Sequence, residues 1–175
     1  MIRKAVLEDA DRLSEIVVYG WRTAYKDLIP ESYLYGKMSV AKRYTRFLEQ
    51  LSQPHDYYVY EETESGLVKG FVVATECRDE DASVNAYEVI AIYVEPAYKA
   101  QGIGAKLMAF SETLALSNGK DLMKLWVLDG NVSSRAFYEK QGYRPDGSQK
   151  NLELFDILEI RYSKRLMEVE AADAL

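Results

Sequence analysis

Hydrophobic residues in the first part of the chain recur at three- and four-residue steps, with polar residues between them. The most regular pattern follows Glu8-Asp9 and predicts an amphipathic helix that ends near Lys26. A second pattern of this kind starts at Val40 and stops at Gln53-Pro54. Between them, Pro30-Glu31-Ser32 is typical of a helix start with proline in the first turn. The N-terminal segment is therefore predicted to be mainly helical.

Runs of β-branched and aromatic residues, separated by turn residues, predict strands elsewhere. Two further helices are expected, from Gly102 to Asn118-Gly119 and from Asn131 to Gly142. After Tyr143 the pattern predicts two strands around a polar loop from Asp146 to Asn151. The other strands are expected at residues 2–6, 57–61, 67–77, 87–94 and 122–128.

Length and composition limit the domain organisation and the location. The chain has 175 residues, of which 48% are hydrophobic and 29% charged, as in ordinary globular proteins. We expect a single domain over residues 1–166 and a frayed tail over 167–175, where no pattern continues. No apolar run approaches the roughly 18 residues that a membrane span needs, so we expect a cytoplasmic protein without a membrane partner.

Charge and rare residue types exclude some chemistry. A formal net charge of −6 argues against a nucleic-acid partner and is compatible with a cationic amine substrate. The single cysteine, Cys77, excludes an internal disulfide and a cysteine-cluster metal site, and we expect no metal. His55 stands beside Pro54, where a solvated loop histidine is a more common interpretation than a general base.

A glycine-rich loop follows the apolar strand Tyr87–Val94. Pro96 ends that strand, and the next helix must begin near Gly102-Ile103-Gly104, where two of three positions lack a side chain. Free backbone N–H groups at a helix N-terminus bind anions, so a phosphate or pyrophosphate is the expected ligand. The sequence that follows, Ala105-Lys106-Leu107, fits neither a P-loop nor a Rossmann fingerprint.

A second motif lies about 30 residues further on. Asn131 suits the N-cap of a helix that continues through Phe137 and Tyr138, and Gly142 ends that helix before Tyr143. The two motifs are separated by a predicted helix and a predicted strand.

Together, the two motifs resemble the GNAT superfamily of N-acetyltransferases. The family's acetyl-CoA loop has Arg or Gln, two residues, Gly, one residue, and Gly or Ala, and here it is Lys99-Ala100-Gln101-Gly102-Ile103-Gly104 with lysine in the first position. The segment from Asn131 to Tyr143 is similar to the family's Asn, helix, Tyr, three residues, Gly, aromatic. The resemblance implies an α+β fold, an α/β three-layer sandwich with a mixed, mostly antiparallel sheet of six to seven strands and helices on both faces. It also implies acetyl-CoA as co-substrate and a possible homodimer.

The same resemblance implies roles for individual residues. Tyr138 would act as the acid near the thioester sulfur, although the reference pKa of a phenol, about 10, is above that of a thiol, about 8.5. A hydrogen bond to the sulfur would then replace full proton transfer. The predicted cofactor-binding residues are Ile92, Tyr93, Val94, Lys99, Gln101, Gly102, Ile103, Gly104, Ala105, Asn131 and Ser134.

The acceptor side is less defined. If the central strand alternates without a bulge, Glu88 shares an apolar face with Ile90 and Ile92, where a carboxylate can serve as a base, directly or through a water. The aromatic residues of the first two helices resemble a GNAT subgroup in which these helices cover the acceptor. Trp21, Tyr25 and Tyr33 are therefore predicted substrate residues, with aromatic core packing equally open for Trp21.

The resulting hypothesis is an enzyme that transfers acetyl from acetyl-CoA to a primary amine by direct attack in a ternary complex. A small-molecule amine, such as a polyamine, an amino acid derivative or an aminoglycoside, is favoured because aromatic helices suit closure over a small ligand. A protein N-terminus or lysine side chain is an alternative acceptor. A sensor that binds acyl-CoA without turnover is a second alternative, although Tyr138 and Glu88 are both present.

Overall fold

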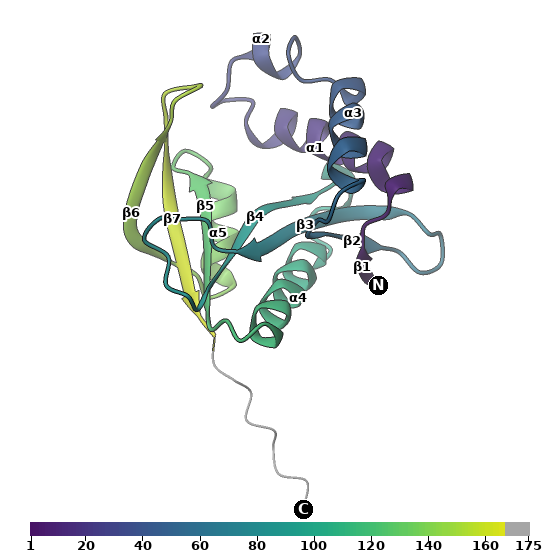
Figure 1. The fold of residues 1–175 in the computed structure, drawn as a ribbon. Helices are drawn as coiled ribbons and strands as arrows, with labels where there is room; N and C mark the ends of the chain where they lie inside the picture. The colour runs from purple at the N-terminus through teal and green to yellow at the C-terminus, as the bar shows by residue number, and fades with distance from the viewer. Residues whose placement is uncertain (167–175) are drawn as a thin grey trace, which may run out of the picture.

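A seven-stranded mixed sheet forms the centre of the computed structural model, which describes residues 1–166 (Figure 1). The strand order is β1-β2-β3-β4-β5-β7-β6, and every neighbouring pair is antiparallel except β4 and β5. The predicted fold class is thereby confirmed, whereas the tail predicted at 167–175 lies outside the described residues. The strands are β1 (Ile2–Lys4), β2 (Tyr57–Glu61), β3 (Val68–Glu76), β4 (Ala86–Val94), β5 (Leu122–Leu128), β6 (Arg144–Leu152) and β7 (Ile157–Arg165).

Helices cover both faces of this sheet. Helices α1 (Ala10–Ala24), α2 (Glu31–Leu34) and α3 (Val40–Leu51) lie on one side, and α4 (Ile103–Ser117) and α5 (Val132–Lys140) on the other (Figure 1). Two 3₁₀ turns, η1 (Leu7–Asp9) and η2 (Pro96–Tyr98), precede α1 and α4. Within residues 1–166 no helix combines the length and the apolar character that crossing a membrane requires.

Alternation along the strands supplies one hydrophobic core to each face. On β3, Phe71 packs with α1 and α3, including Leu13 and Phe47, whereas its neighbour Val72 packs with Leu107 of α4. Successive side chains of a strand point to opposite faces, so a single strand serves both cores. The central strands are thus packed from both sides, and the end of β4 lies in the same core as the first turn of α4.

The C-terminal hairpin differs from the prediction. The polar stretch Asp146–Asn151 is not the loop between the two strands but part of β6, and the chain reverses at residues 153–156. Strand β6 is the edge of the sheet, and most of its residues are exposed, so it lacks the apolar signal of a buried strand. Its register also shifts between Pro145 and Gln149, which places the polar residues in an irregular part of the ladder.

The two parallel strands separate part of the way along their length. Residues Ala86–Val89 of β4 pair with Leu122–Leu125 of β5, and the pairing stops there. Directly after the last pair, Ile90 is an extra residue in the β3–β4 ladder, because Ala74 pairs with Val89 and Val73 with Ala91. A bulge of this kind bends its strand and leaves backbone groups unpaired. The gap between β4 and β5 opens where these unpaired groups lie.

Candidate active site

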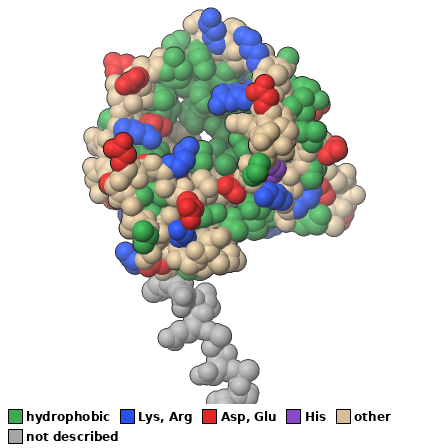
Figure 2. All heavy atoms as spheres, in the orientation of Figure 1, with side chains coloured by type: hydrophobic (Ala, Val, Ile, Leu, Met, Phe, Trp, Pro, Cys, Tyr) green, Lys and Arg blue, Asp and Glu red, His purple; other side chains and the backbone are tan. Residues whose placement is uncertain are grey.

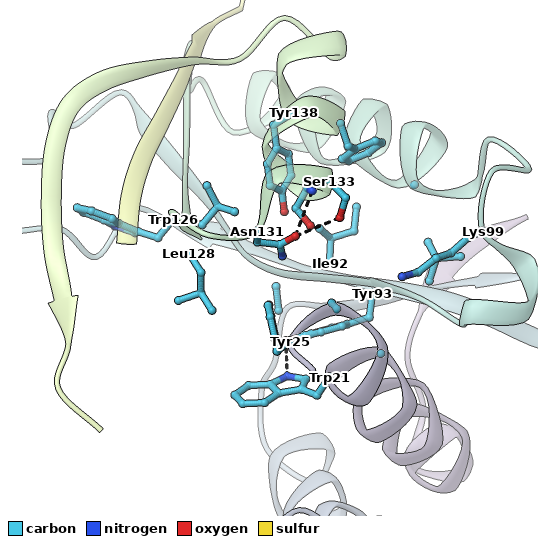
Figure 3. Close-up of a pocket in the computed structure, with 18 of the residues that line it drawn as sticks. Trp21, Tyr25, Ile92, Tyr93, Lys99, Trp126, Leu128, Asn131, Ser133 and Tyr138 are labelled. Atoms are coloured by element: carbon cyan, nitrogen blue, oxygen red, sulfur yellow. Dashed lines mark hydrogen bonds between the residues drawn. The ribbon is translucent and has the colours of Figure 1, made fainter. Parts of the chain in front are cut away.

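A cavity of about 780 Å³ occupies the gap between the two separated strands. Its walls come from the second halves of β4 and β5, the loop before α4, the start of α5 and the end of α1. Figure 2 shows that this face of the molecule is hollowed between hydrophobic side chains, and Figure 3 shows the lining residues. The volume falls within the range usual for small-molecule and cofactor sites.

The N-terminus of α4 forms one end of the cavity. Its N-cap, Gly102, has a left-handed backbone (φ 78°) and supplies no side-chain cap, so the N–H groups of Ile103, Gly104 and Ala105 have no helical acceptor. Ala100 is also left-handed (φ 61°), which turns the loop sharply in front of the helix. A Cβ on Gly104 would come within 3.1 Å of the Phe137 ring. These free donors at the positive end of a helix dipole fit a diphosphate such as that of coenzyme A.

Most of the predicted cofactor residues line this cavity. The exception is Gln101, which is exposed and is not part of the wall. Lys99 does line it, and Figure 3 shows its side chain directed toward the interior. A lysine ammonium there favours an anionic ligand as a point charge, without the forked geometry of an arginine.

Tyr138 lies on α5, and its ring points from that helix into the cavity (Figure 3). Asn131 fixes the start of this helix, because its Oδ1 accepts hydrogen bonds from the Ser134 N–H and the Ser133 hydroxyl, both at 3.2 Å. Burial raises the pKa of the Tyr138 phenol well above its usual value, and the nearby Tyr93 phenol raises it further. The hydroxyl therefore remains a proton-bearing donor throughout the neutral range.

An aromatic wall from α1 and β4 faces Tyr138. The Trp21 indole donates a hydrogen bond to the Tyr93 hydroxyl (2.9 Å) and meets Tyr25 edge to face, with 5.1 Å between ring centroids. Burial raises the pKa of Tyr25 well above its usual value, with smaller contributions from Tyr93, Tyr138 and Glu159. Trp21 and Tyr25, two of the three predicted substrate residues, line the cavity.

Tyr33, the third predicted substrate residue, does not line the cavity. It packs edge to face on Phe155 of the C-terminal hairpin (centroids 4.7 Å apart) and lies 6.2 Å from Trp21. Tyr33 therefore lies between Trp21 and Phe155, outside the cavity, and supports the Trp21 ring by packing. The sequence of this short helix does not show whether Tyr33 faces the cavity or packs behind its wall.

The geometric premise for Glu88 as the base is wrong. The bulge at Ile90 reverses the alternation, so that Val89 and Ile92 pack in the same core and Glu88 faces the other side. Glu88 is only 3% exposed, is not part of the cavity wall, and accepts hydrogen bonds from the guanidinium of Arg78 at 3.0 and 3.1 Å. Its carboxylate is therefore committed to an ion pair that holds the loop after β3.

We expect Glu88→Gln to keep kcat/KM within about threefold of the wild-type value. The amide can still accept one hydrogen bond from Arg78, so the free energy of unfolding should fall by about 1 kcal/mol. Steady-state kinetics and chemical denaturation of the same preparation measure both quantities. A loss of activity of about 100-fold without a loss of stability would restore Glu88 as a base.

Among the wall residues that the sequence did not single out are Trp126 and Leu128 on β5 and Glu159 on β7. They come together because β5 and β7 pair, with Leu128 opposite Glu159. Local sequence shows only the alternation of two strands, and the pairing that joins them spans about 30 residues. Within the strand sequences, only Trp126, a large ring at an alternating position, marks a residue that could line a site.

The acidic loop between β3 and β4 is also part of this region. Asp79 and Asp81 form ion pairs with Arg161 of β7 at 3.0 and 2.6 Å, and Asp79 accepts a hydrogen bond from the Trp126 indole (3.0 Å). Burial alone would raise the pKa of Asp79, but the bonds from Trp126 and Arg161 lower it overall. Through Asp79, the loop therefore fixes the position of the Trp126 indole against Arg161 of β7.

The cavity places a helix N-terminus with free N–H groups and the Tyr138 ring in the same space, an arrangement that fits a diphosphate-bearing ligand. The family model described as "Acetyltransferase (GNAT) family" matches residues 21–143, more than half of the chain. The chain therefore belongs to the GNAT family of acetyl-CoA-dependent N-acetyltransferases, and the predicted enzyme class is confirmed.

Individual relatives agree with this family. The chain is 32% identical over 148 residues to an uncharacterized N-acetyltransferase, YuaI, of Bacillus subtilis, covering 83% of this chain and 79% of the relative. It is 25% identical over 154 residues to spermidine N(1)-acetyltransferase of Thermoplasma acidophilum, covering 84% and 91%. Among solved structures, the PaiA N-acetyltransferase of Thermoplasma acidophilum in complex with coenzyme A has a TM-score of 0.70 at 21% identity, covering 94% of this chain and 98% of that one.

Proposed function

We propose that this protein acetylates a small-molecule primary amine by direct attack on acetyl-CoA in a ternary complex. The observation that carries the proposal is one continuous cavity, bounded by the α4 N-terminus and by the aromatic wall of Trp21 and Tyr25. The donor and the acceptor would therefore meet in the same space. Trp21, Tyr25 and Ile29 close this space from the α1 side, which suits a small ligand better than an extended polypeptide. A spermidine acetyltransferase among the relatives supports the same acceptor class.

The residues of the chain divide the chemistry between them. Acetyl-CoA, when bound, supplies an activated acetyl thioester. The N–H groups at Ile103, Gly104 and Ala105, with Lys99, bind its diphosphate. The unpaired backbone groups beyond the Ile90 bulge are positioned to donate to the oxyanion that develops on the carbonyl. As the C–N bond forms and the C–S bond breaks, Tyr138 donates a hydrogen bond to the departing thiolate, and the attacking nitrogen loses its proton to water.

A covalent acetyl-enzyme on cysteine is not supported by the structure. Cys77 is the chain's only cysteine and is not part of the cavity wall. Burial raises the pKa of its thiol, which disfavours the nucleophilic thiolate. Direct transfer to the amine is the simpler route through these residues.

We expect the rate to show no alkaline loss below about pH 10. The pKa of Tyr138 is raised, so its protonated, donating form persists to higher pH than that of a free phenol. The rate should instead rise with pH as more of the acceptor amine becomes neutral. Profiles of kcat and kcat/KM between pH 6 and 10 test this directly. A kcat that declines between pH 7 and 9 would contradict the assigned state of Tyr138.

The proposed acceptor class is tested by thiol release from acetyl-CoA across a panel of amines. The panel contains mono-, di- and polyamines, amino acid amides, an aminoglycoside, and peptides with a free N-terminus or a lysine. We expect release with small amines and none above background with the peptides. Turnover of peptides alone would indicate a protein acetyltransferase, and coenzyme A binding without release on any amine would indicate a sensor.

A further inference from the structure

The charges in the cavity are separated along its length. Among the described residues of the wall, Lys99 is the one cation and Glu159 the one carboxylate. Lys99 lies beside the α4 N-terminus, whereas Glu159 belongs to β7, which pairs with β5 near Trp126 and Leu128. Figure 3 shows Lys99 and Trp126 on opposite sides of Tyr138. One end is thus suited to an anion, and the other end to a cation.

Glu159 and Trp126 are neighbours on one face of the sheet. Leu128 pairs with Glu159, and Trp126 pairs with Arg161 in the same antiparallel ladder. Trp126 is therefore the diagonal neighbour of Glu159, at a separation that a large ring and a long carboxylate side chain can span. A carboxylate beside the face of an indole is a combination that binds alkylammonium groups, because both attract a positive charge.

An ammonium group already lies in this position. The Nζ of Lys150, on β6, is 4.0 Å from the centre of the Trp126 ring and 3.7 Å from Glu159 Oε2. The Lys150 side chain is 48% exposed and is not part of the cavity wall, so it reaches the pair from outside. The Glu159 side chain is only 19% exposed, but an ion pair at this distance with a long, exposed lysine is weak and exchangeable. The chain's own lysine thus shows which chemical group the pair accepts.

The indole is held in place independently of Lys150. Its N–H donates to Asp79, and the guanidinium of Arg161 lies 5.5 Å from its ring centre. The positive charge of Arg161 is met by ion pairs with Asp79, Asp81 and Asp146, so it does not repel a second cation. Replacing Lys150 with an ammonium from a ligand would leave this support unchanged.

We propose that Trp126 and Glu159 form an ammonium subsite that binds a second cationic centre of the acceptor, in exchange for Lys150. The inference rests on the proposed small-molecule amine function and narrows it to acceptors with at least two amino groups, that is, diamines and polyamines. One amine is acetylated near Tyr138 while the other remains charged at Glu159. Glu159 is then a substrate-binding residue and does not take the proton of the reacting nitrogen.

Three variants and two amines of equal length test this inference. 1,4-Diaminobutane has a reacting amine and a second, charged amine, whereas butylamine has the reacting amine alone. The wild type should have a KM for the diamine at least about tenfold below that for butylamine. Glu159→Gln should raise the KM for the diamine by about tenfold or more and leave kcat and the KM for butylamine within about threefold. Lys150→Gln should lower the KM for the diamine about two- to fivefold, because a competing ammonium has been removed.

Glu153→Gln is the matched control. It removes the same charge from an exposed position on the turn between β6 and β7, outside the cavity wall, and should leave both amines unaffected. Calorimetry of 1,4-diaminobutane with the coenzyme A complex gives a second readout that does not need turnover. There, Glu159→Gln should weaken binding by the same factor.

Three results would overturn the subsite while acetyl transfer itself remained. The first is a KM for the diamine that does not change in Glu159→Gln. The second is an equal loss of kcat for both amines in Glu159→Gln, which would make Glu159 a base. The third is a KM for the diamine that rises in Lys150→Gln. A wild-type protein that binds coenzyme A but acetylates none of the amines would be different. That result would contradict the proposed function itself, and the subsite with it.

Discussion

The Gly102→Asp variant should bind coenzyme A at least about 100-fold more weakly than the wild type and keep its fold. The substitution places a carboxylate beside the free N–H groups of Ile103, Gly104 and Ala105, where it competes for the donors and repels the diphosphate. Aspartate tolerates the left-handed backbone better than most residues, and a Cβ at Gly102 has no atom within 4 Å. The loss of affinity should therefore far exceed the small loss of stability that a left-handed non-glycine residue causes. Titration calorimetry with coenzyme A measures it.

The opposite end of α4 supplies a matched control. Gly119 is also left-handed (φ 70°) with open space around its Cβ position, but it is not part of the cavity wall. Gly119→Asp introduces the same strain and charge and should leave coenzyme A affinity within about threefold. Gly102→Asn, which is uncharged, should fall between Gly102→Asp and the wild type. Equal affinities for Gly102→Asp and Gly119→Asp would show that the diphosphate binds elsewhere.

Tyr138→Phe should lower kcat by about 100-fold and leave the dissociation constant for coenzyme A within about threefold. The phenyl ring preserves the packing of α5, whereas the hydrogen bond to the departing sulfur is lost. Because this bond matters only as the C–S bond breaks, its removal should act on kcat and not on binding. Steady-state kinetics and calorimetry on the same preparation separate the two effects.

Tyr143→Phe controls for the loss of a buried phenol close by. Tyr143 follows α5, is fully buried, and lies 6.3 Å from Tyr138 between ring centroids, but is not part of the cavity wall. Its variant should retain wild-type kcat within about threefold. If both variants lost activity to the same extent, a packing defect would explain the result, and Tyr138 would have no part in the chemistry.

The parts of the fold with strong local signals could be predicted from the sequence. Helical periodicity indicated α1 and α3, and glycines at Gly102 and Gly119 marked both ends of α4. The cofactor end of the cavity was predictable for the same reason, because a strand, a glycine turn and a helix N-terminus are contiguous in the chain. The polar residues of the edge strand β6 were predicted as a loop because this strand buries too little apolar surface to show alternation.

The acceptor side was harder to predict because long-range pairing builds it. One extra residue, Ile90, reverses the side on which Glu88 points, and a bulge of this kind leaves no clear mark in an apolar run. Trp126 and Glu159 come together through the β5–β7 ladder, and Lys150 reaches them from a third strand. Each of these residues is typical of its own strand. Their combination appears only in the assembled sheet.

A crystal structure of the protein with coenzyme A is the most direct test of the central claim. We predict that diphosphate oxygens accept hydrogen bonds, within about 3.5 Å, from backbone N–H groups between Ile103 and Ala105. The thiol sulfur should lie in the cavity within hydrogen-bonding reach of the Tyr138 hydroxyl. A diphosphate bound away from the α4 N-terminus, or a sulfur directed away from Tyr138, would contradict the account.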